Sequence, residues 1–139
     1  MTTVNLKLEQ SYNFIFYGFC LCFFSGFGQT YFVAIFNSFF SQDLNLSFSE
    51  LGGLYGAATF TSALILIPVG KLIDEIDLRL FTFLSFVILS FACFSLSRAD
   101  SYLSLFFSFL ILRLGGQGLM SHTAIESSMQ NASDHHKLK

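Results

Sequence analysis

The chain has 139 residues, of which 53% are hydrophobic and only 12% carry a formal charge. Soluble domains have about twice that share of charged residues. Phe occurs 20 times and Pro once. The composition excludes an ordinary water-soluble domain and favours a protein that lies in a lipid bilayer.

Long runs without charge divide the chain. One lies between Glu9 and Asp43, and two more cover 51–70 and 80–97. A fourth covers 101–121 and is interrupted only by Arg113. An apolar helix of roughly 20 residues crosses the hydrocarbon layer of a membrane. We therefore predict an all-α membrane protein with four transmembrane helices, at about 13–38, 51–69, 80–97 and 102–121.

Basic residues beside these segments predict their orientation. Five of the seven Lys and Arg residues lie in the N-terminal tail (1–12), the second connection and the C-terminal tail (122–139). The first connection has none, and the third has only Arg98. Because cytoplasmic loops are enriched in Lys and Arg, both tails are predicted to be cytoplasmic, in a cell or inner membrane.

The first segment carries a polar stripe. Gly26, Gln29, Thr30, Val33 and Asn37 share one face of an ideal helix, by the i, i+3, i+4 spacing. One interpretation is a helix that lines a solute or proton pathway, with Gln29, Thr30 and Asn37 as its polar groups. The other is hydrogen bonding between helices. The sequence leaves both open.

The second segment has signals for its start and its packing. Ser47 and Glu50 have the spacing of a capping box, which predicts that the helix begins there. Gly52 and Gly56 form a G-x-x-x-G pair, which lets two helix backbones approach closely in lipid. We predict tight helix packing on this face, with a partner that the pattern does not identify.

Arg113 is the one charged residue inside a predicted span. It lies about 16 Å along a helix that starts near Tyr102, close to the midplane. A cation at that depth costs several kcal/mol unless it is paired or hydrated. The acidic residues all lie near a membrane surface or in a tail. Arg113 could pair with an acid on helices outside this chain, hold an anionic ligand in a watery cavity, or extend to the surface.

Two motifs resemble the major facilitator superfamily. The connection after the second segment is similar to the Gly-x-Leu-x-Asp-Arg-x-Gly-Arg-Arg loop of that family, with Glu75 and Asp77 where the family has Arg and Gly. In the fourth segment, residues 113–118 resemble the family's Arg-x-x-x-Gln-Gly motif. The positions that fit the two motifs are Gly70, Leu72, Asp74, Arg79, Arg113, Gln117 and Gly118.

The resemblance covers the chain from about residue 12 to the tail. It implies part of the N-terminal half of a twelve-helix carrier, with 122–139 leading toward a fifth helix. It also implies that Asp74 and Arg79 belong to a charge network that closes an inner gate, with Gly70 at a tight turn. Arg113 and Gln117 would belong to the central cavity, in proton coupling or substrate binding. Asp77 is better explained as the N-cap of the third helix.

The expected function is secondary active transport of a small solute by alternating access, with an organic anion such as a monocarboxylate favoured by Arg113. The expected partners are the bilayer, the solute, a coupling proton or ion, and the remaining helices of the carrier. The alternatives are a stand-alone four-helix protein, either a dimeric small exporter or a membrane anchor or assembly subunit. We expect no enzyme activity, cofactor, metal or nucleic acid.

Overall fold

The structure is a computed structural model that describes residues 2–71 and 76–137, and in those residues it is built from helices. This confirms the all-α membrane fold. The helical elements in chain order are α1 (Thr2–Ser25), the 3₁₀ turn η1 (Gly26–Gly28), α2 (Thr30–Ala34), α3 (Asn37–Asp43), α4 (Phe48–Lys71), α5 (Leu78–Ser97), α6 (Tyr102–Leu112), the π-helical segment η3 (Arg113–Met120) and α7 (Ser121–Lys137).

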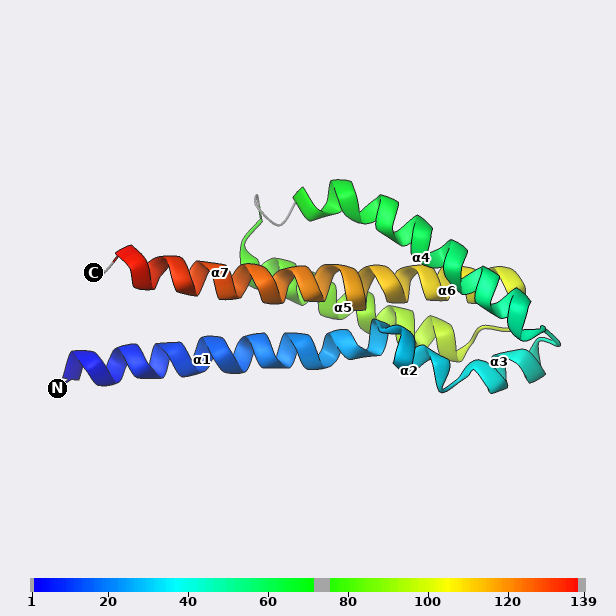
Figure 1. Ribbon diagram of the computed structural model, residues 1–139, viewed down its shortest axis with the longest axis horizontal. Helices are drawn as coiled ribbons and strands as arrows, with labels where there is room; N and C mark the ends of the chain where they lie inside the picture. The colour runs from blue at the N-terminus through cyan, green and yellow to red at the C-terminus, as the bar shows by residue number, and fades with distance from the viewer. Residues whose placement is uncertain (1, 72–75, 138–139) are drawn as a thin grey trace.

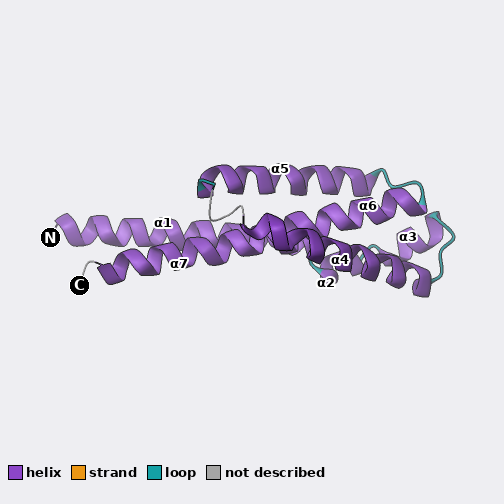
Figure 2. Ribbon diagram, turned by 90° about the horizontal axis from the view of Figure 1, so that it is seen from above, coloured by secondary structure: helices purple, strands orange, loops and turns teal. Residues whose placement is uncertain are grey.

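The helices form an elongated bundle. α6, η3 and α7 follow one another without a break, and α7 lies beside α1, so that both ends of the chain are at the same end of the bundle (Figure 1). α5 packs along α6, and α4 packs on α6 and η3 (Figure 2). The segment η3 therefore lies at the centre, where it contacts α1, α4, α5 and η1.

Three helices in the described part are long and apolar enough to span a membrane, by length and composition: Phe48–Lys71, Leu78–Ser97 and Tyr102–Met129. They contain the predicted segments 51–69, 80–97 and 102–121. The first predicted segment corresponds to a shorter apolar helix, Tyr12–Gly28, followed by short helical pieces.

The first predicted segment differs from the continuous helix expected over 13–38. Helix α1 ends at Ser25, η1 makes one tight turn, and Gln29 is extended, with φ −83° and ψ 151°. Helices α2 and α3 then continue in new directions (Figure 1). Two glycines weaken the helix at this point, because glycine is among the poorest helix formers.

The break in the first segment meets η3 backbone to backbone. A Cβ atom added at Gly28 would lie 2.7 Å from each of Gly116 Cα, Gln117 N and Leu112 O. A Cβ at Gly116 would lie 2.7 Å from Gly28 Cα and Gly28 N. Neither position can carry a side chain unless the backbones separate, so both glycines are required by this contact.

The other two glycines of η3 face different neighbours. A Cβ at Gly115 would lie 3.0 Å from Ile88 Cγ2 and 3.3 Å from Leu89 N, on α5. A Cβ at Gly118 would lie 3.0 Å from Leu66 Cδ1, on α4. The glycine-rich segment thus lets α4, α5 and η1 approach one helix within a few residues.

The apolar core lies between α4, α5 and α6, and many large side chains outside it are exposed. Phe109, Leu105 and Ala58 are completely buried, while Phe60 and Phe83 are among the exposed aromatic residues. Exposed apolar area on this scale is what lipid-facing helices require.

The predicted helix starts agree with the structure. The backbone N–H of Ser47 donates to Glu50 Oε2 at 2.8 Å, and the Glu50 N–H donates to Ser47 Oγ at 3.2 Å. The Asp77 carboxylate accepts from the Arg79 N–H at 2.8 Å and caps α5. The capping box at Ser47 and the N-cap at Asp77 are both confirmed.

We expect Gly28→Ala to lower the thermal unfolding midpoint in detergent. Forcing one methyl group into this contact should cost about 1–3 kcal/mol, the range found for overpacking. The matched control is Gly53→Ala, because Gly53 is exposed on α4 and its Cβ position has no atom within 4 Å. Equal unfolding midpoints for Gly28→Ala and Gly53→Ala would contradict the close backbone contact between Gly28 and Gly116.

Candidate functional site

Arg113 begins the π-helical segment and is buried, with 8% of its surface exposed. Its Nη1 donates to the backbone carbonyl of Gly28 at 3.1 Å and to Thr30 Oγ1 at a longer 3.5 Å. The Gly28 carbonyl is available because the helix ends there. The break in the first segment therefore supplies the nearest acceptor for the guanidinium.

Tyr55 of α4 completes the environment of Arg113. The guanidinium carbon lies 5.3 Å from the centre of the Tyr55 ring, within cation–π range. The Tyr55 hydroxyl donates to Thr30 Oγ1 at 3.1 Å. We call Gly28, Thr30, Tyr55 and Arg113 the Arg113 cluster. It joins η1, α2, α4 and η3 through one side chain.

The partners of Arg113 are all uncharged. In residues 2–71 and 76–137, no ion pair joins Arg113 to a carboxylate, and its Nε is buried without a hydrogen-bond partner. A carbonyl, a hydroxyl and a ring face stabilise the guanidinium but leave its charge uncompensated. A buried charge attracts an anion more strongly than an exposed one does.

A hollow of about 270 Å³ lies next to the cluster, between α2 and α4. Thr30 and Tyr55 line it and also contact Arg113, and Asn37 adds an amide. We call this space the polar hollow after these three side chains, although most of its surface is apolar. Its lining is Thr30, Val33, Ala34, Asn37, Phe48, Leu51, Gly52 and Tyr55. A solute there would meet two hydroxyls and an amide; Arg113 does not line the hollow but contacts Thr30 and Tyr55, which do.

The structure brings together some of the predicted pathway residues. Thr30 and Asn37 line the same hollow, and Thr30 contacts Arg113. Gln29 is the extended residue before α2, and Gln117 is exposed on η3. Neither glutamine side chain hydrogen-bonds to the cluster in the described part of the chain, so their pathway role remains a prediction.

Two members of the cluster were not predicted. Tyr55 is the one tyrosine in the second apolar run, which was a usable signal, because a buried hydroxyl in lipid seeks a partner. The Gly28 carbonyl gave no signal, since it becomes an acceptor only where the helix breaks.

The predicted gate residues are only partly described. Gly70 lies in the last turn of α4 rather than in a tight turn after the helix, and a Cβ there would have no atom of the described residues within 4 Å. Asp74 lies outside the described residues. Arg79 is exposed in the first turn of α5. The charge network at this end of the bundle therefore remains a prediction.

Gly52 and Gly56 are exposed on α4, and a Cβ at either would have no atom within 4 Å. They form no close helix contact within the described residues, although Gly52 borders the polar hollow. Close helix packing through Gly52 and Gly56 therefore remains a prediction, and it would involve a helix outside the described residues.

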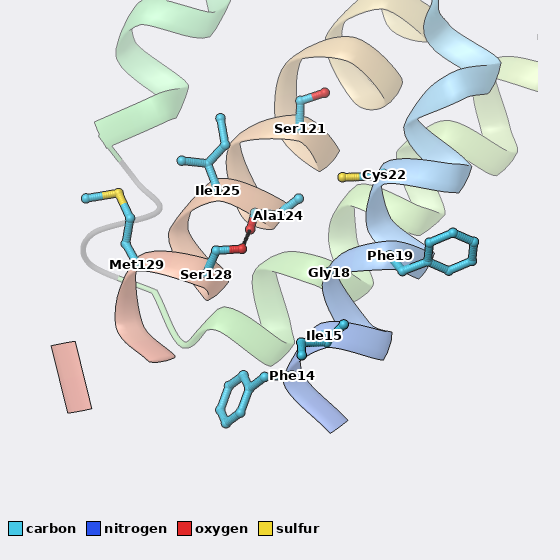
Figure 3. Close-up of a pocket in the computed structure, with 10 residues that line it drawn as sticks. All are labelled: Phe14, Ile15, Gly18, Phe19, Cys22, Ser121, Ala124, Ile125, Ser128 and Met129. Atoms are coloured by element: carbon cyan, nitrogen blue, oxygen red, sulfur yellow. Dashed lines mark hydrogen bonds between the residues drawn. The ribbon is translucent and has the colours of Figure 1, made fainter. Parts of the chain in front are cut away.

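A second hollow lies between α1 and α7 and is mainly apolar. Its volume is about 680 Å³, and Phe14, Phe19, Ile125 and Met129 are among the side chains around it (Figure 3). None of the predicted pathway residues lines it. No group of three or more His, Cys, Asp or Glu side chains in the described ranges is close enough to hold a metal ion.

The comparison with protein families gives one result. The model of the Major Facilitator Superfamily matches residues 6–137, which is nearly the whole chain. No curated protein and no solved structure matches significantly.

We expect Tyr55→Phe and Tyr55→Leu to separate the two contacts of Tyr55. Phe keeps the ring beside Arg113 and loses the hydrogen bond to Thr30, at a cost of roughly 0.5–1.5 kcal/mol. Leu also loses the cation–π contact, which adds about 1–2 kcal/mol. Thermal unfolding in detergent measures both, with Tyr12→Phe at an exposed tyrosine as control. Equal midpoints for the Phe and Leu variants would show that the ring contributes nothing.

Proposed function

This chain belongs to the major facilitator superfamily, and we propose that it carries a small organic anion across the membrane by alternating access. The family and the apolar helices make it an integral membrane protein of a transporter family. The proposal that the solute is an anion rests on one observation. The guanidinium of Arg113 is buried with only uncharged partners, next to the polar hollow.

The contacts support a monocarboxylate as the solute. A carboxylate in the polar hollow can accept hydrogen bonds from the Thr30 hydroxyl and the Asn37 amide, while the Tyr55 hydroxyl donates to Thr30. The nearby charge of Arg113 makes an anion more favourable than a neutral solute of the same shape. The hollow, at about 270 Å³, is slightly smaller than typical ligand pockets, which suits a small solute.

The proposal assigns the remaining predicted residues to steps of the cycle. Gln29 and Gln117 would contact the solute or a coupling proton or ion in another state of the carrier. Gly70, Asp74 and Arg79 would bias the carrier between its two states through charge contacts at the inner gate. Coupling to a proton or ion gradient would supply the free energy for uphill transport.

Orientation and partners follow from charge and packing. Both tails are proposed to be cytoplasmic, supported by the five basic residues on that side and by the common end of the bundle where the chain starts and stops. The open face of α4 at Gly52 and Gly56 is proposed to pack against the remaining helices of the carrier.

The family match favours a carrier over the two alternatives, a dimeric four-helix exporter and an anchor or assembly subunit. Members of this superfamily move solutes without covalent chemistry, which supports the expectation that the chain is not an enzyme.

We expect Arg113→Ala, in the protein expressed from its complete gene, to reduce uptake of a labelled monocarboxylate on the order of tenfold or more. Arg113→Lys keeps the positive charge, but an ammonium group cannot reproduce the planar hydrogen-bonding geometry of the guanidinium. This variant should therefore retain partial uptake. Arg98→Ala is the control, because Arg98 is exposed outside the cluster. Unchanged anion uptake by the Arg113→Ala protein in liposomes would refute the proposal.

We expect Arg79→Gln to shift the carrier toward its inward-open state, because it removes one charge from the proposed gate. The measurement is the rate at which a membrane-impermeant thiol reagent modifies a cysteine introduced near Gly70, applied from the cytoplasmic side. Lys71→Gln is the matched control, since it removes a charge from the adjacent turn of α4. A rate that rises equally in both variants would mean that Arg79 has no special role.

A further inference from the structure

An aromatic pocket lies on the other side of α2 from the polar hollow. Thr30, Val33 and Ala34 face the hollow, whereas Phe32 and Phe36 face the pocket, which encloses about 530 Å³. The pocket is bounded by α2, α3 and the end of α5. Its lining is Phe27, Phe32, Phe36, Phe39, Phe40, Asp43, Cys93, Leu96, Ser97, Ala99 and Leu112.

The phenylalanine rings wall more than one side of this pocket. The Phe27 and Phe32 rings are 4.9 Å apart at 73°, and the Phe32 and Phe36 rings are 5.6 Å apart at 60°. Rings at such angles turn their faces in different directions. The face of each ring carries the negative part of its quadrupole and can attract a cation.

An exposed acidic side chain, Asp43, borders the same pocket. Asp43 is the last residue of α3, and its carboxylate has no hydrogen bond or ion pair within the described ranges. Ser97, the last residue of α5, also lines the pocket. Helix C-termini carry partial negative charge, so both helix ends add to the effect of the carboxylate.

Arg98 follows α5, between the lining residues Ser97 and Ala99. Its guanidinium carbon lies 5.7 Å from the centre of the Phe94 ring, and in the described residues no salt bridge joins it to Asp43. A lipid acyl chain would match the phenylalanine walls but would gain nothing from Asp43. Aromatic faces together with a carboxylate select a cation that is itself apolar.

We propose that the aromatic pocket binds a lipophilic ammonium cation, with the charged nitrogen near Asp43 and its apolar groups against the phenylalanine rings. This site is separate from the Arg113 cluster and does not depend on the transported solute being an anion. Asp43 lies in the first connection, on the predicted outer side, which gives the cation a route from the aqueous phase.

Cys93 makes the site directly testable, because its thiol lines the pocket. The experiment uses the complete protein with Cys20→Ala and Cys22→Ala in phosphatidylglycerol nanodiscs, and follows modification of Cys93 by N-ethylmaleimide. Benzyltrimethylammonium is the probe, and neopentylbenzene is its neutral isostere. We expect the cation to slow the modification of Cys93 in a saturable manner and the isostere to have a much weaker effect.

Two substitutions test the recognition chemistry. Asp43→Asn should raise the half-protecting concentration of the cation roughly fivefold, the value of an exposed charge pair. Phe36→Leu keeps apolar volume but removes one ring face, and should raise it roughly two- to fivefold. The matched control protein keeps Cys22 as its one cysteine. Cys22 lines the second hollow, between α1 and α7, so the cation should not change the rate at which Cys22 is modified.

Equal protection by the isostere, or unchanged protection in the Asp43→Asn protein, would overturn the proposal. Equal protection of Cys22 would also overturn it, because it would mean simple partition of the probe into lipid. A parallel assay in phosphatidylcholine nanodiscs identifies the source of the cation. Slow modification there without probe, relieved by Asp43→Asn, would support the site with a choline headgroup as its ligand.

Discussion

The close approach of Gly28 and Gly116 determines much of the arrangement around it. Because two backbones meet where other residues would place Cβ atoms, the 3₁₀ turn can rest directly on the π-helical segment. That contact lies just after the end of α1 and positions the Gly28 carbonyl beside Arg113. The same segment admits α5 at Gly115 and α4 at Gly118. Two irregular segments thus fit each other where two regular helices would have been held apart by their side chains.

The electrostatic situation of Arg113 follows from this geometry. A buried cation is tolerated when dipoles replace its hydration shell, and here a carbonyl, a hydroxyl and an aromatic face do so. A carboxylate partner would stabilise the folded state more, but it would also remove the attraction for an anion. The arrangement suits the proposed anion site, because a bound anion would make the electrostatic free energy of Arg113 more favourable.

Composition and charge were sufficient to predict the helical membrane fold, since the bilayer imposes run lengths that can be read directly from the sequence. Local caps such as Asp77 were also predictable, because they depend on residues a few positions apart. The break after Ser25 was not, because it depends on a contact between residues far apart in the chain, Gly28 and Gly116. The stripe assigned to one face assumed an unbroken helix; the extended residue Gln29 changes the phase, so that only Thr30, Val33 and Asn37 still line one space.

The π-helical segment has a consequence for the rest of the last long helix. A π-helical turn contains more residues than an α-helical turn, so the eight residues of η3 turn α7 to a different angle from the one that an uninterrupted α-helix would give it. That rotation directs Ala124 and Ser127 inward and places α7 against α1. The face that α7 turns toward α1 therefore depends on the π-helical turns of η3 rather than on residues within α7.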